Sequence, residues 1–341
     1  MGADLRRDVP VPGASGPERS GGQPSVTVLI PAYNAAAFVE DAIRSALGQT
    51  YRDLEVLVVD DGSTDPTPQR AGAFGGPVRL LGVSHGGLSW ARNHGMRAAA
   101  GRFVIFLDAD DILERELVAR AVDLLERRPD LGFVFPNFRW LFADGRSSPP
   151  VLAPEGHGGE SEMVLEDPVR QLLLAGYSIS PSGLGARREM LAEAGYFDES
   201  LWGSEDFEYL SRVYLRRPVG FLTAPLVRRR HHTGSMTSQF SRMAPCVARS
   251  IDTVARRFLA AGRLDSVRAI RRYGRRCMET VIRGLLSRGE GRQAFALLLR
   301  YRRLLWGPRL PLLAAACWVP RPGLRALRRA RGWFSRDSGR E

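Results

Sequence analysis

Three carboxylates follow a short apolar run in the first third of the chain: Asp108, Asp110 and Asp111 come directly after residues 104–107. The apolar run is typical of a strand that is buried on both faces of a parallel sheet. Carboxylates at the carboxyl end of such a strand face the crevice where open α/β sheets bind ligands. Asp108 and Asp110, separated by one alanine, could together reach one hard cation and its ligand. Alternatively, Asp110 or Asp111 caps a helix that begins near Ile112, and these residues alone leave both interpretations open.

Strands and helices alternate around these carboxylates. The apolar run 26–30 predicts a strand that ends at Pro31, and the next segments predict a helix at 35–47 and a strand at 54–59. A strand, a helix and a strand at this spacing form a βαβ unit with parallel pairing. Farther along, we expect an amphipathic helix at 114–127 and a strand at 133–135. The pattern indicates an α/β fold with a Rossmann-like, mostly parallel sheet and flanking helices.

The loop after the first strand, residues 31–34, contains no glycine. A dinucleotide-binding fold would need Gly-x-Gly-x-x-Gly there, so that backbone amides can hold a pyrophosphate. The absence of this motif argues against a nicotinamide-dependent enzyme. A phosphate ligand would then need its charge neutralised elsewhere, and a metal ion held by the Asp108/Asp110 pair would do so.

Length and composition favour one catalytic domain plus an appendage, since the chain has 341 residues of which 44% are hydrophobic. The three cysteines, Cys246, Cys277 and Cys317, lack metal-binding spacing and are too few for a disulfide framework, so we expect reduced thiols in the cytoplasm. Residues 1–24 are rich in Gly, Pro and Ser without an apolar run, which predicts a disordered leader rather than a signal peptide.

The basic charge is concentrated at the carboxyl end. All 49 basic residues are arginine, and the balance is +18 from Ser241 onward but −6 before it. Such asymmetry suggests a tail that meets an anionic surface, and no nucleic-acid motif accompanies it. Helical periodicity runs from Ala244, with Gly262, Gly284 and Gly289 expected to separate the helices. The apolar run 310–319 is too short to span a bilayer.

Aromatic residues among the last arginines, Trp306, Trp318, Trp333 and Phe334, fit a segment that lies in the membrane interface. A helical cap folded onto the catalytic domain is the competing interpretation.

Four segments of the first half together resemble the family 2 glycosyltransferases, which have the GT-A fold. They are Val28-Leu29-Ile30-Pro31-Ala32-Tyr33-Asn34, Val58-Val59-Asp60-Asp61-Gly62-Ser63, Gly87-Leu88-Ser89-Trp90-Ala91-Arg92-Asn93-His94-Gly95 and Phe106-Leu107-Asp108-Ala109-Asp110-Asp111. The resemblance covers about residues 25–240. It implies a donor half at about 25–130 and an acceptor half at about 131–240, followed by the basic helical region 241–341.

The resemblance implies roles for residues of the donor half. Pro31 would belong to the donor-binding residues, Tyr33 would stack on the nucleotide base, and Asp61 would accept a hydrogen bond from it. Asp108 would approach the ribose, and Asp110 would hold Mg²⁺ or Mn²⁺ against the diphosphate. The alternative for Tyr33 is an ordinary loop aromatic. His85 departs from the family, whose members often carry Asn there.

Two further residues acquire roles in the acceptor half. Transfer needs a carboxylate that removes a proton from the acceptor hydroxyl, and Asp206 in the Glu205-Asp206 pair is the candidate. The same pair could instead cap a helix, favoured by the helix dipole. His232, rather than His231, matches the family's closing His and would lie near the diphosphate, whereas the alternative is a plain surface His. Trp202 could stack on an acceptor sugar or belong to the core.

The resemblance, together with the chemistry of these residues, implies an inverting, metal-dependent glycosyltransferase of the hexosyltransferase type. It would transfer a sugar from a nucleotide diphosphate donor, UDP-linked by preference, to a hydroxyl of a glycan or lipid-linked acceptor in cell-surface polysaccharide synthesis. We expect a cytoplasmic protein, with peripheral contact to the inner face of the plasma membrane. Two alternatives remain. A nucleotidyltransferase would want a Gly-rich or basic phosphate loop after the first strand, and an inert nucleotide-sugar-binding module would not need Asp61, Asp110 and Asp206 intact.

Overall fold

The structure is a computed structural model that describes residues 24–152, 161–173, 180–232, 240–305 and 310–317. The chain divides into two compact units, Met1–His232 and Thr233–Glu341. Each unit is described by itself. The boundary expected at residue 240 adjoins the segment 233–239, and that segment, like the leader, lies outside the described residues.

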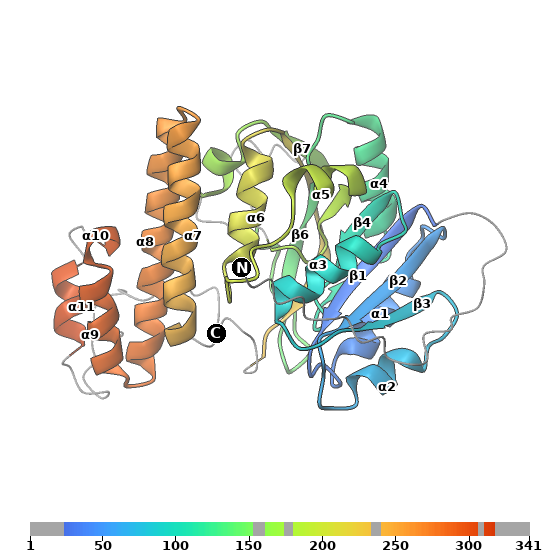
Figure 1. Ribbon diagram of the computed structural model, residues 1–341, viewed down its shortest axis with the longest axis horizontal. Helices are drawn as coiled ribbons and strands as arrows, with labels where there is room; N and C mark the ends of the chain where they lie inside the picture. Colours follow the sequence, from blue (N-terminus) through green and yellow to red (C-terminus); the bar gives the residue numbers. More distant parts are fainter. Residues whose placement is uncertain (1–23, 153–160, 174–179, 233–239, 306–309, 318–341) are drawn as a thin grey trace, which may run out of the picture. The chain divides into compact units, whose positions relative to one another are not determined.

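A nine-stranded sheet forms the centre of the first unit, in the order β3-β2-β1-β4-β8-β6-β9-β5, with β7 paired to β9 (Figure 1). The pairings give β1, β2, β3, β4, β6 and β9 one direction, and β5, β7 and β8 the other. The expected α/β class with a mostly parallel sheet is therefore confirmed. The strands are β1 (Val26–Ala32), β2 (Leu54–Asp60), β3 (Val78–Gly82), β4 (Phe103–Phe106), β5 (Ile112–Leu113), β6 (Val134–Leu141), β7 (Glu162–Leu165), β8 (Gly185–Arg187) and β9 (Val219–Arg230).

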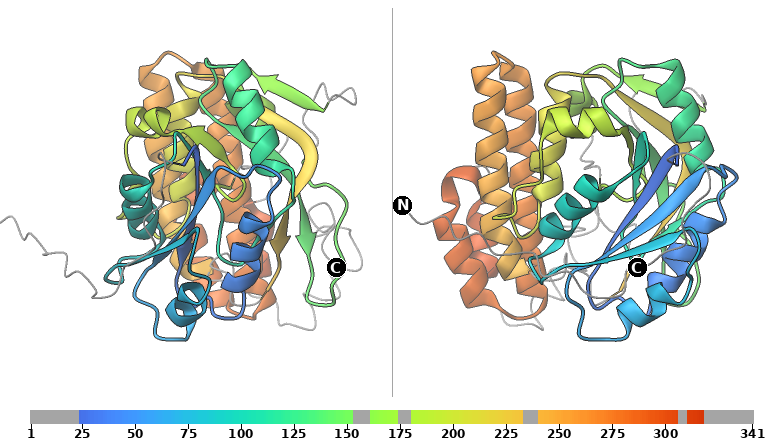
Figure 2. Two further views of the ribbon diagram at one scale, coloured as in Figure 1. Left: turned by 90° about the vertical axis from the view of Figure 1, so that its right-hand side faces the viewer. Right: turned by 45° about the vertical axis from the view of Figure 1, so that its right-hand side comes forward.

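Helices cover both faces of this sheet (Figure 2). They are α1 (Val39–Leu47), α2 (Thr67–Gly72), α3 (Leu88–Ala98), α4 (Leu117–Arg127), the π-helical turn η1 (Val169–Leu173), α5 (Arg188–Ala194) and α6 (Glu205–Tyr214). Gly95 lets α3 lie directly on β1, because a Cβ atom there would come within 2.1 Å of the Leu29 side chain. Each residue of β1 and β2 is buried, which explains why both strands are almost continuously apolar.

Several predicted boundaries are wrong, and the strand expected at 133–135 runs instead from Val134 to Leu141. β1 continues through Pro31 to Ala32, because proline lacks only the N–H donor and its φ suits an extended strand. α1 begins at Val39 rather than at residue 35, and α4 begins at Leu117 rather than at residue 114. Residues 112–113 form β5, paired with β9, so no helix begins there for Asp110 or Asp111 to cap.

The second unit is helical in its described residues, 240–305 and 310–317. Its helices are α7 (Phe240–Ala260), α8 (Leu264–Ser287), α9 (Gly291–Arg300), α10 (Arg302–Leu305) and α11 (Leu310–Ala316). Gly262 and Gly289 end α7 and α8 with left-handed φ values of 73° and 78°. Gly284 lies inside α8, so its predicted role between helices is wrong.

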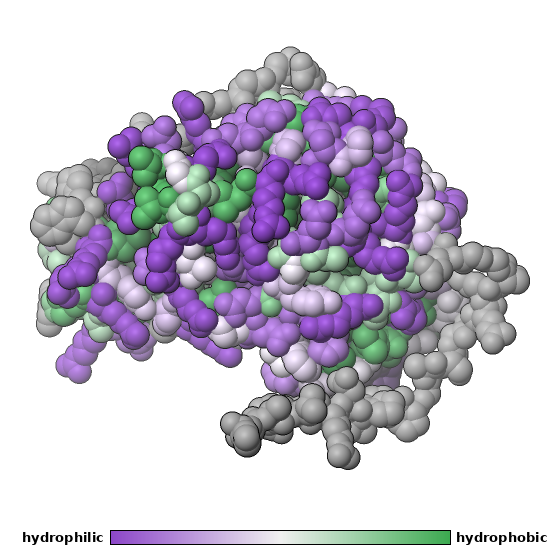
Figure 3. Space-filling view, turned by 45° about the horizontal axis from the view of Figure 1, so that its top comes forward, coloured by the Kyte–Doolittle hydropathy of each residue, from purple (hydrophilic) through white to green (hydrophobic). Residues whose placement is uncertain are grey.

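Hydrophilic residues cover much of the visible face of this helical unit, and apolar residues form smaller patches between them (Figure 3). No helix among the described residues is both long enough and apolar enough to cross a bilayer. The four aromatic residues expected in the membrane interface, from Trp306 to Phe334, lie outside the described residues.

Candidate active site

The loops that follow β1 and β2 are tied to each other at the carboxyl edge of the sheet. Asn34 has a left-handed φ of 48°, which asparagine tolerates better than most residues. Its backbone N–H donates to the Ser63 hydroxyl at 2.9 Å, and its side-chain oxygen accepts from the backbone N–H of Thr64 at 2.8 Å. These contacts hold the neighbouring Tyr33 where its side chain is 46% exposed. Pro31, by contrast, is buried within β1.

Asp61, just after β2, is buried and held by a ring of donors. The backbone N–H groups of Gly86 and Gly87 donate to its two carboxylate oxygens, each at 2.8 Å. Nδ1 of His85 lies 2.9 Å from Oδ2 and 3.0 Å from the Asp61 carbonyl oxygen. Since both of these are acceptors, Nδ1 carries a proton in this arrangement. Burial raises the pKa of Asp61, and the hydrogen bonds from Gly86, Gly87 and His85 oppose that rise.

His85 also stacks on Tyr33, with ring centroids 4.1 Å apart and planes 21° from parallel. The two rings form an exposed aromatic surface beside Asp61. A carboxylate offers about four acceptor sites, so three donors leave Asp61 one for a ligand. The arrangement can therefore stack on a planar ring and accept a hydrogen bond from it.

The chain turns sharply after β4, where the N–H of Asp111 donates to the carbonyl of Asp108 at 3.0 Å. Asp111 is buried, and its Oδ1 accepts the backbone N–H of Arg230 at 3.0 Å, which fastens the turn to β9. Burial and the neighbouring charge of Asp110 raise the pKa of Asp111 to about 8, against the charge of Arg229. Asp111 therefore holds the turn, and Asp110 extends from it toward the edge of the sheet.

His232, the last residue of the first unit, contacts this turn. Its Nε2 lies 2.9 Å from Oδ2 of Asp110, and both side chains are partly exposed, at 24% and 33%. The preceding His231 lies differently, with its ring edge-on to Trp140 at a centroid distance of 6.2 Å. Of the two adjacent histidines, the one that the resemblance selects is thus the one that contacts Asp110.

Arg92 connects the donor half to the acceptor half. It lies on α3, its side chain is only 2% exposed, and it forms two ion pairs: Nη2 with Oδ1 of Asp108 at 2.9 Å, and Nη1 with Oε1 of Glu205 at 2.8 Å. Burial alone would lower the pKa of Arg92, but the charges of Asp108 and Glu205 raise it above its ordinary value. The guanidinium therefore holds the carboxylate after β4 and the first residue of α6 against each other.

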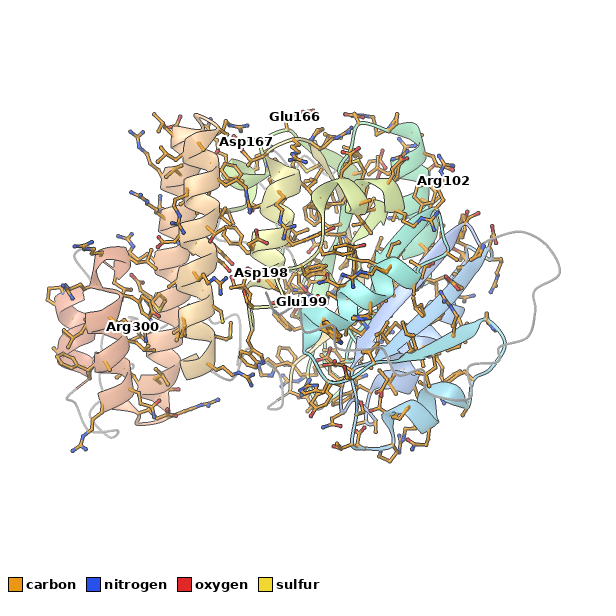
Figure 4. The ribbon with its side chains drawn as sticks, viewed as in Figure 1. Arg102, Glu166, Asp167, Asp198, Glu199 and Arg300 are labelled. Carbon is orange, nitrogen blue, oxygen red and sulfur yellow. The ribbon has the colours of Figure 1, made fainter. Side chains whose placement is uncertain are left out.

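Asn93, next to Arg92, fixes the loop that leads into α6. Its Nδ2 donates to the Glu199 carboxylate at 2.8 Å and to the carbonyl of Phe197 at 3.0 Å. Figure 4 shows Asp198 and Glu199 on this loop, near α3. The Phe197 ring in turn stacks on Tyr209 of α6 at 4.1 Å. These contacts explain how α6 is brought to the carboxyl ends of β1 and β4.

Asp206 is in the first turn of α6, after Ser204 with its left-handed φ of 61°. Its Oδ1 accepts the backbone N–H of Phe207 at 2.6 Å, and within the described residues its Oδ2 has no hydrogen-bond partner. Burial raises the pKa of Asp206 to about 7; the charge of Glu205 adds to the rise and that of Arg92 opposes it. A carboxylate that titrates near neutral pH is suited to general base catalysis. Trp202, four residues before it, is half-buried.

The turn at residues 108–111, called the acidic turn below, suits a metal ion that takes most of its ligands from a bound molecule and water. No group of three or more His, Cys, Asp or Glu side chains in the described part of the chain is arranged to hold a metal. Asp110 and His232 supply one carboxylate and one imidazole, while Asp108 is engaged by Arg92. Mg²⁺ is commonly bound through one or two carboxylates together with substrate phosphates and water. The residues present therefore fit a divalent ion that binds together with a phosphorylated ligand.

Arg92, Asn93 and Glu205 are site residues to which the sequence analysis gave no role. A signal was available, because the buried face of α3 includes Ser89, Arg92 and Asn93. Charged and amide side chains on the buried face of a helix need partners. Their positions therefore indicate polar contacts with another element, although the helix pattern does not say which.

Comparison with known proteins identifies the family that this chain resembles. Residues 27–190 match the family model described as Glycosyl transferase family 2, so the expected resemblance is confirmed. An uncharacterized glycosyltransferase, RC0461 from Rickettsia conorii, is 26% identical over 219 residues. The match covers 63% of this chain but only 35% of that relative, so the chain spans about a third of its length.

Two solved structures share the fold at low identity. One is Staphylococcus aureus TarS 1–349 in complex with UDP-GlcNAc, which has a TM-score of 0.53 and 19% identity and covers 89% of this chain and 92% of that one. The other is the mannosyltransferase PcManGT from Pyrobaculum calidifontis in complex with GDP-Man and Mn²⁺, which has a TM-score of 0.54 and 20% identity and covers 92% and 88%. They show that the chain has a GT-A transferase fold.

Proposed function

We propose that this chain, whose residues 27–190 match the model of glycosyl transferase family 2, is an inverting, metal-dependent hexosyltransferase. It transfers a sugar from a nucleotide diphosphate to a hydroxyl of a glycan or lipid-linked acceptor. The observation that carries this proposal is the double ion pair of Arg92 with Asp108 and Glu205. This ion pair joins Asp108, in the turn that would hold the donor, to the start of α6, the helix that carries the candidate base Asp206.

The nucleotide base binds at Tyr33 and Asp61 in this proposal. The base stacks on the Tyr33–His85 surface, and Asp61 accepts a hydrogen bond from a ring N–H. Uracil and guanine carry such an N–H at neutral pH, whereas adenine and cytosine do not. The carboxylate therefore favours UDP- and GDP-linked donors, and the smaller uracil is our first choice. The bound nucleotides of TarS and PcManGT, UDP-GlcNAc and GDP-Man, agree with this pair.

The diphosphate binds at the acidic turn. Asp110 and His232 would hold a Mg²⁺ or Mn²⁺ ion there, and Asp108, oriented by Arg92, faces the ribose. The ion, when bound, neutralises the negative charge of the departing diphosphate. PcManGT was solved in complex with Mn²⁺, which supports the use of a divalent ion in this proposal.

Asp206 acts on the acceptor. The acceptor oxygen attacks the anomeric carbon from the side opposite the diphosphate, while Asp206 takes the proton of that hydroxyl. The bond between the anomeric carbon and the phosphate oxygen breaks, and the nucleoside diphosphate leaves with the electron pair. One displacement inverts the anomeric configuration. The pKa of Asp206, about 7, lets the carboxylate both take and return a proton near neutral pH.

The acceptor is presented at a membrane in this proposal. The balance of +18 after residue 240 supports peripheral binding to the anionic inner face of the plasma membrane. The protein would then work on the cytoplasmic side, where nucleotide sugars are made.

Hydrolysis of a panel of UDP-, GDP-, ADP- and CDP-sugars, each with Mn²⁺ and with EDTA, tests the proposal. We expect turnover of a UDP- or GDP-sugar only when Mn²⁺ is present. Equal turnover in EDTA would contradict the proposed dependence on a metal ion. Preference for an ADP- or CDP-sugar would contradict the proposed role of Asp61. Binding of a donor without hydrolysis or transfer to any acceptor would favour the inert binding module.

A further inference from the structure

A hollow of about 680 Å³ in the second unit is lined mainly by arginines. Its walls come from three helices: α7 contributes Ile251 and Asp252, α8 contributes Arg271, Arg272 and Arg275, and α10 contributes Arg303 and Leu304. The volume is in the range of ordinary small-molecule sites, about 300–1,000 Å³. Nothing in the proposed glycosyl transfer uses these residues.

The helices that form the hollow are packed closely at its base. Gly274 of α8 faces Ile251 of α7, and a Cβ atom on that glycine would come within 2.6 Å of the Ile251 side chain. Ile251 is only 1% exposed and forms an apolar floor. Arg271 and Arg275 flank Gly274 on α8, so the close approach of the two helices brings both to the rim. The arginines therefore project from a rigid base.

The positive charge in the hollow is poorly compensated. Nε of Arg275 lies 3.8 Å from Oε1 of Glu279. Within the described residues, the side chains of Arg271, Arg272 and Arg303 form no hydrogen bond or ion pair. Asp252 is the one carboxylate in the lining. Like charges four residues apart on a helix destabilise it, and Arg271 and Arg275 have this spacing. Such a cluster costs free energy unless an anion occupies it.

Other arginines of α8 differ in this respect. Arg268 pairs with Asp265 at 3.1 Å, and Arg283 pairs with Glu279 at 3.4 Å. Three arginines without a paired carboxylate, Arg271, Arg272 and Arg303, thus line the hollow, where they can contact one ligand together. A guanidinium group binds phosphate oxygens through two parallel N–H···O bonds. A single carboxylate has too few oxygens and too little charge to pair in this way with four guanidinium groups.

We propose that this hollow binds a phosphomonoester or diphosphate group. Such a group carries two or more negative charges and enough oxygens for several guanidinium groups at once. It could belong to the headgroup of a lipid or to a soluble phosphate compound, since both present the same chemistry. The proposal does not depend on the glycosyl transfer.

Calorimetric titration of the full chain with inorganic pyrophosphate in EDTA tests the proposal. EDTA removes the divalent ions that would hold pyrophosphate at the acidic turn of the first unit. The test variant combines Arg271→Gln and Arg303→Gln, which removes two uncompensated charges from two walls. The matched control combines Arg268→Gln and Arg292→Gln, which removes the same charge from exposed positions of the same unit outside the hollow.

We expect the test variant to bind pyrophosphate about 10-fold more weakly or worse, because each charged hydrogen bond contributes roughly 1.5–3 kcal/mol. The affinity of the control variant for pyrophosphate should stay within about 2-fold of that of the native chain, because only distant, screened charges are lost. Absence of binding to the native chain, or an equal loss in both variants, would overturn the proposal. Thermal unfolding without ligand checks that both variants are folded, and the test variant should be no less stable than the native chain because it relieves repulsion.

Vesicles distinguish the source of the phosphate. Phosphatidic acid presents a phosphomonoester, whereas phosphatidylserine at equal surface charge does not. Preference for phosphatidic acid that the test variant loses and the control keeps would identify a lipid headgroup. Pyrophosphate binding without such a preference would identify a soluble phosphate compound.

Discussion

Replacement of Arg92 by methionine should destabilise the first unit strongly. Methionine is unbranched and apolar but lacks the guanidinium group, so it leaves Asp108 and Glu205 without their shared cation. Removing one partner of a buried ion pair costs roughly 3–5 kcal/mol, because the other charge stays buried without compensation. Glu205 is 6% exposed and should incur this cost, whereas Asp108 is 27% exposed and should add about 1 kcal/mol or less.

The assay is thermal unfolding at neutral pH. For domains of about 150–250 residues each kcal/mol shifts Tm by roughly 2–4 °C, so we expect a decrease of about 6–20 °C. Arg97→Met is the matched control on the same helix. Arg97 is exposed and contacts only the ring of Tyr196, at 4.1 Å, so its loss should cost about 1 kcal/mol or less.

If Arg92→Met unfolds within 2 °C of the native chain, or if Arg97→Met is equally damaged, the reasoning from burial and ion pairing is wrong.

The further predictions concern the remaining site and the tail. Asp110→Asn should lower turnover by about two orders of magnitude or more without loss of fold, and near-native transfer would contradict the metal assignment. Asp206→Asn should abolish transfer but leave UDP affinity by calorimetry nearly unchanged, whereas equal losses would make Asp206 a structural cap. In the native enzyme, kcat/KM should rise with pH through about 7, since only the ionised Asp206 can accept a proton. The raised pKa also means that Asp206 contributes stability below its ordinary value of 3.8 that is lost as pH rises through about 7, so Asp206→Asn should raise Tm at pH 8 but not at pH 3. The full chain should float with anionic liposomes at low salt and release as salt rises, and a chain ending at Met243 should not float; equal flotation of both would leave the tail without a membrane role.

Local patterns predicted four of the six strands that run in one direction, β1, β2, β4 and β6, and missed β3 and β9. The apolar runs that became β1, β2 and β4 are buried along their whole length, so continuous hydrophobicity indicated their position in the sheet. The carboxylates that follow β2 and β4 also lie where strand ends predict them. The errors at Pro31 and at the starts of α1 and α4 arose because turn chemistry, rather than hydrophobic period, decides where an element begins.

Long-range pairing could not be predicted in this way. Arg92 and Glu205 are separated by 113 positions, and no local period connects them. The arginines of α8 likewise fit a solvated helix face in sequence, and only the close approach of α7 and α8 at Gly274 shows that some of them share a hollow. Whether a polar side chain is paired, buried or free depends on which distant element covers it.

The position of His232 bears on how this protein can be divided. His232 is the last residue of the first compact unit, and one peptide bond separates it from the second. Junctions between units are usually the safest places to cut or fuse a chain, because few contacts cross them. Here a cut after His232 would set a new terminal carboxylate beside a residue that contacts Asp110, and a cut before it would remove that contact. A separately expressed first unit should therefore keep several residues beyond the junction, and loss of activity in a shorter fragment would report damage to the acidic turn rather than a need for the second unit.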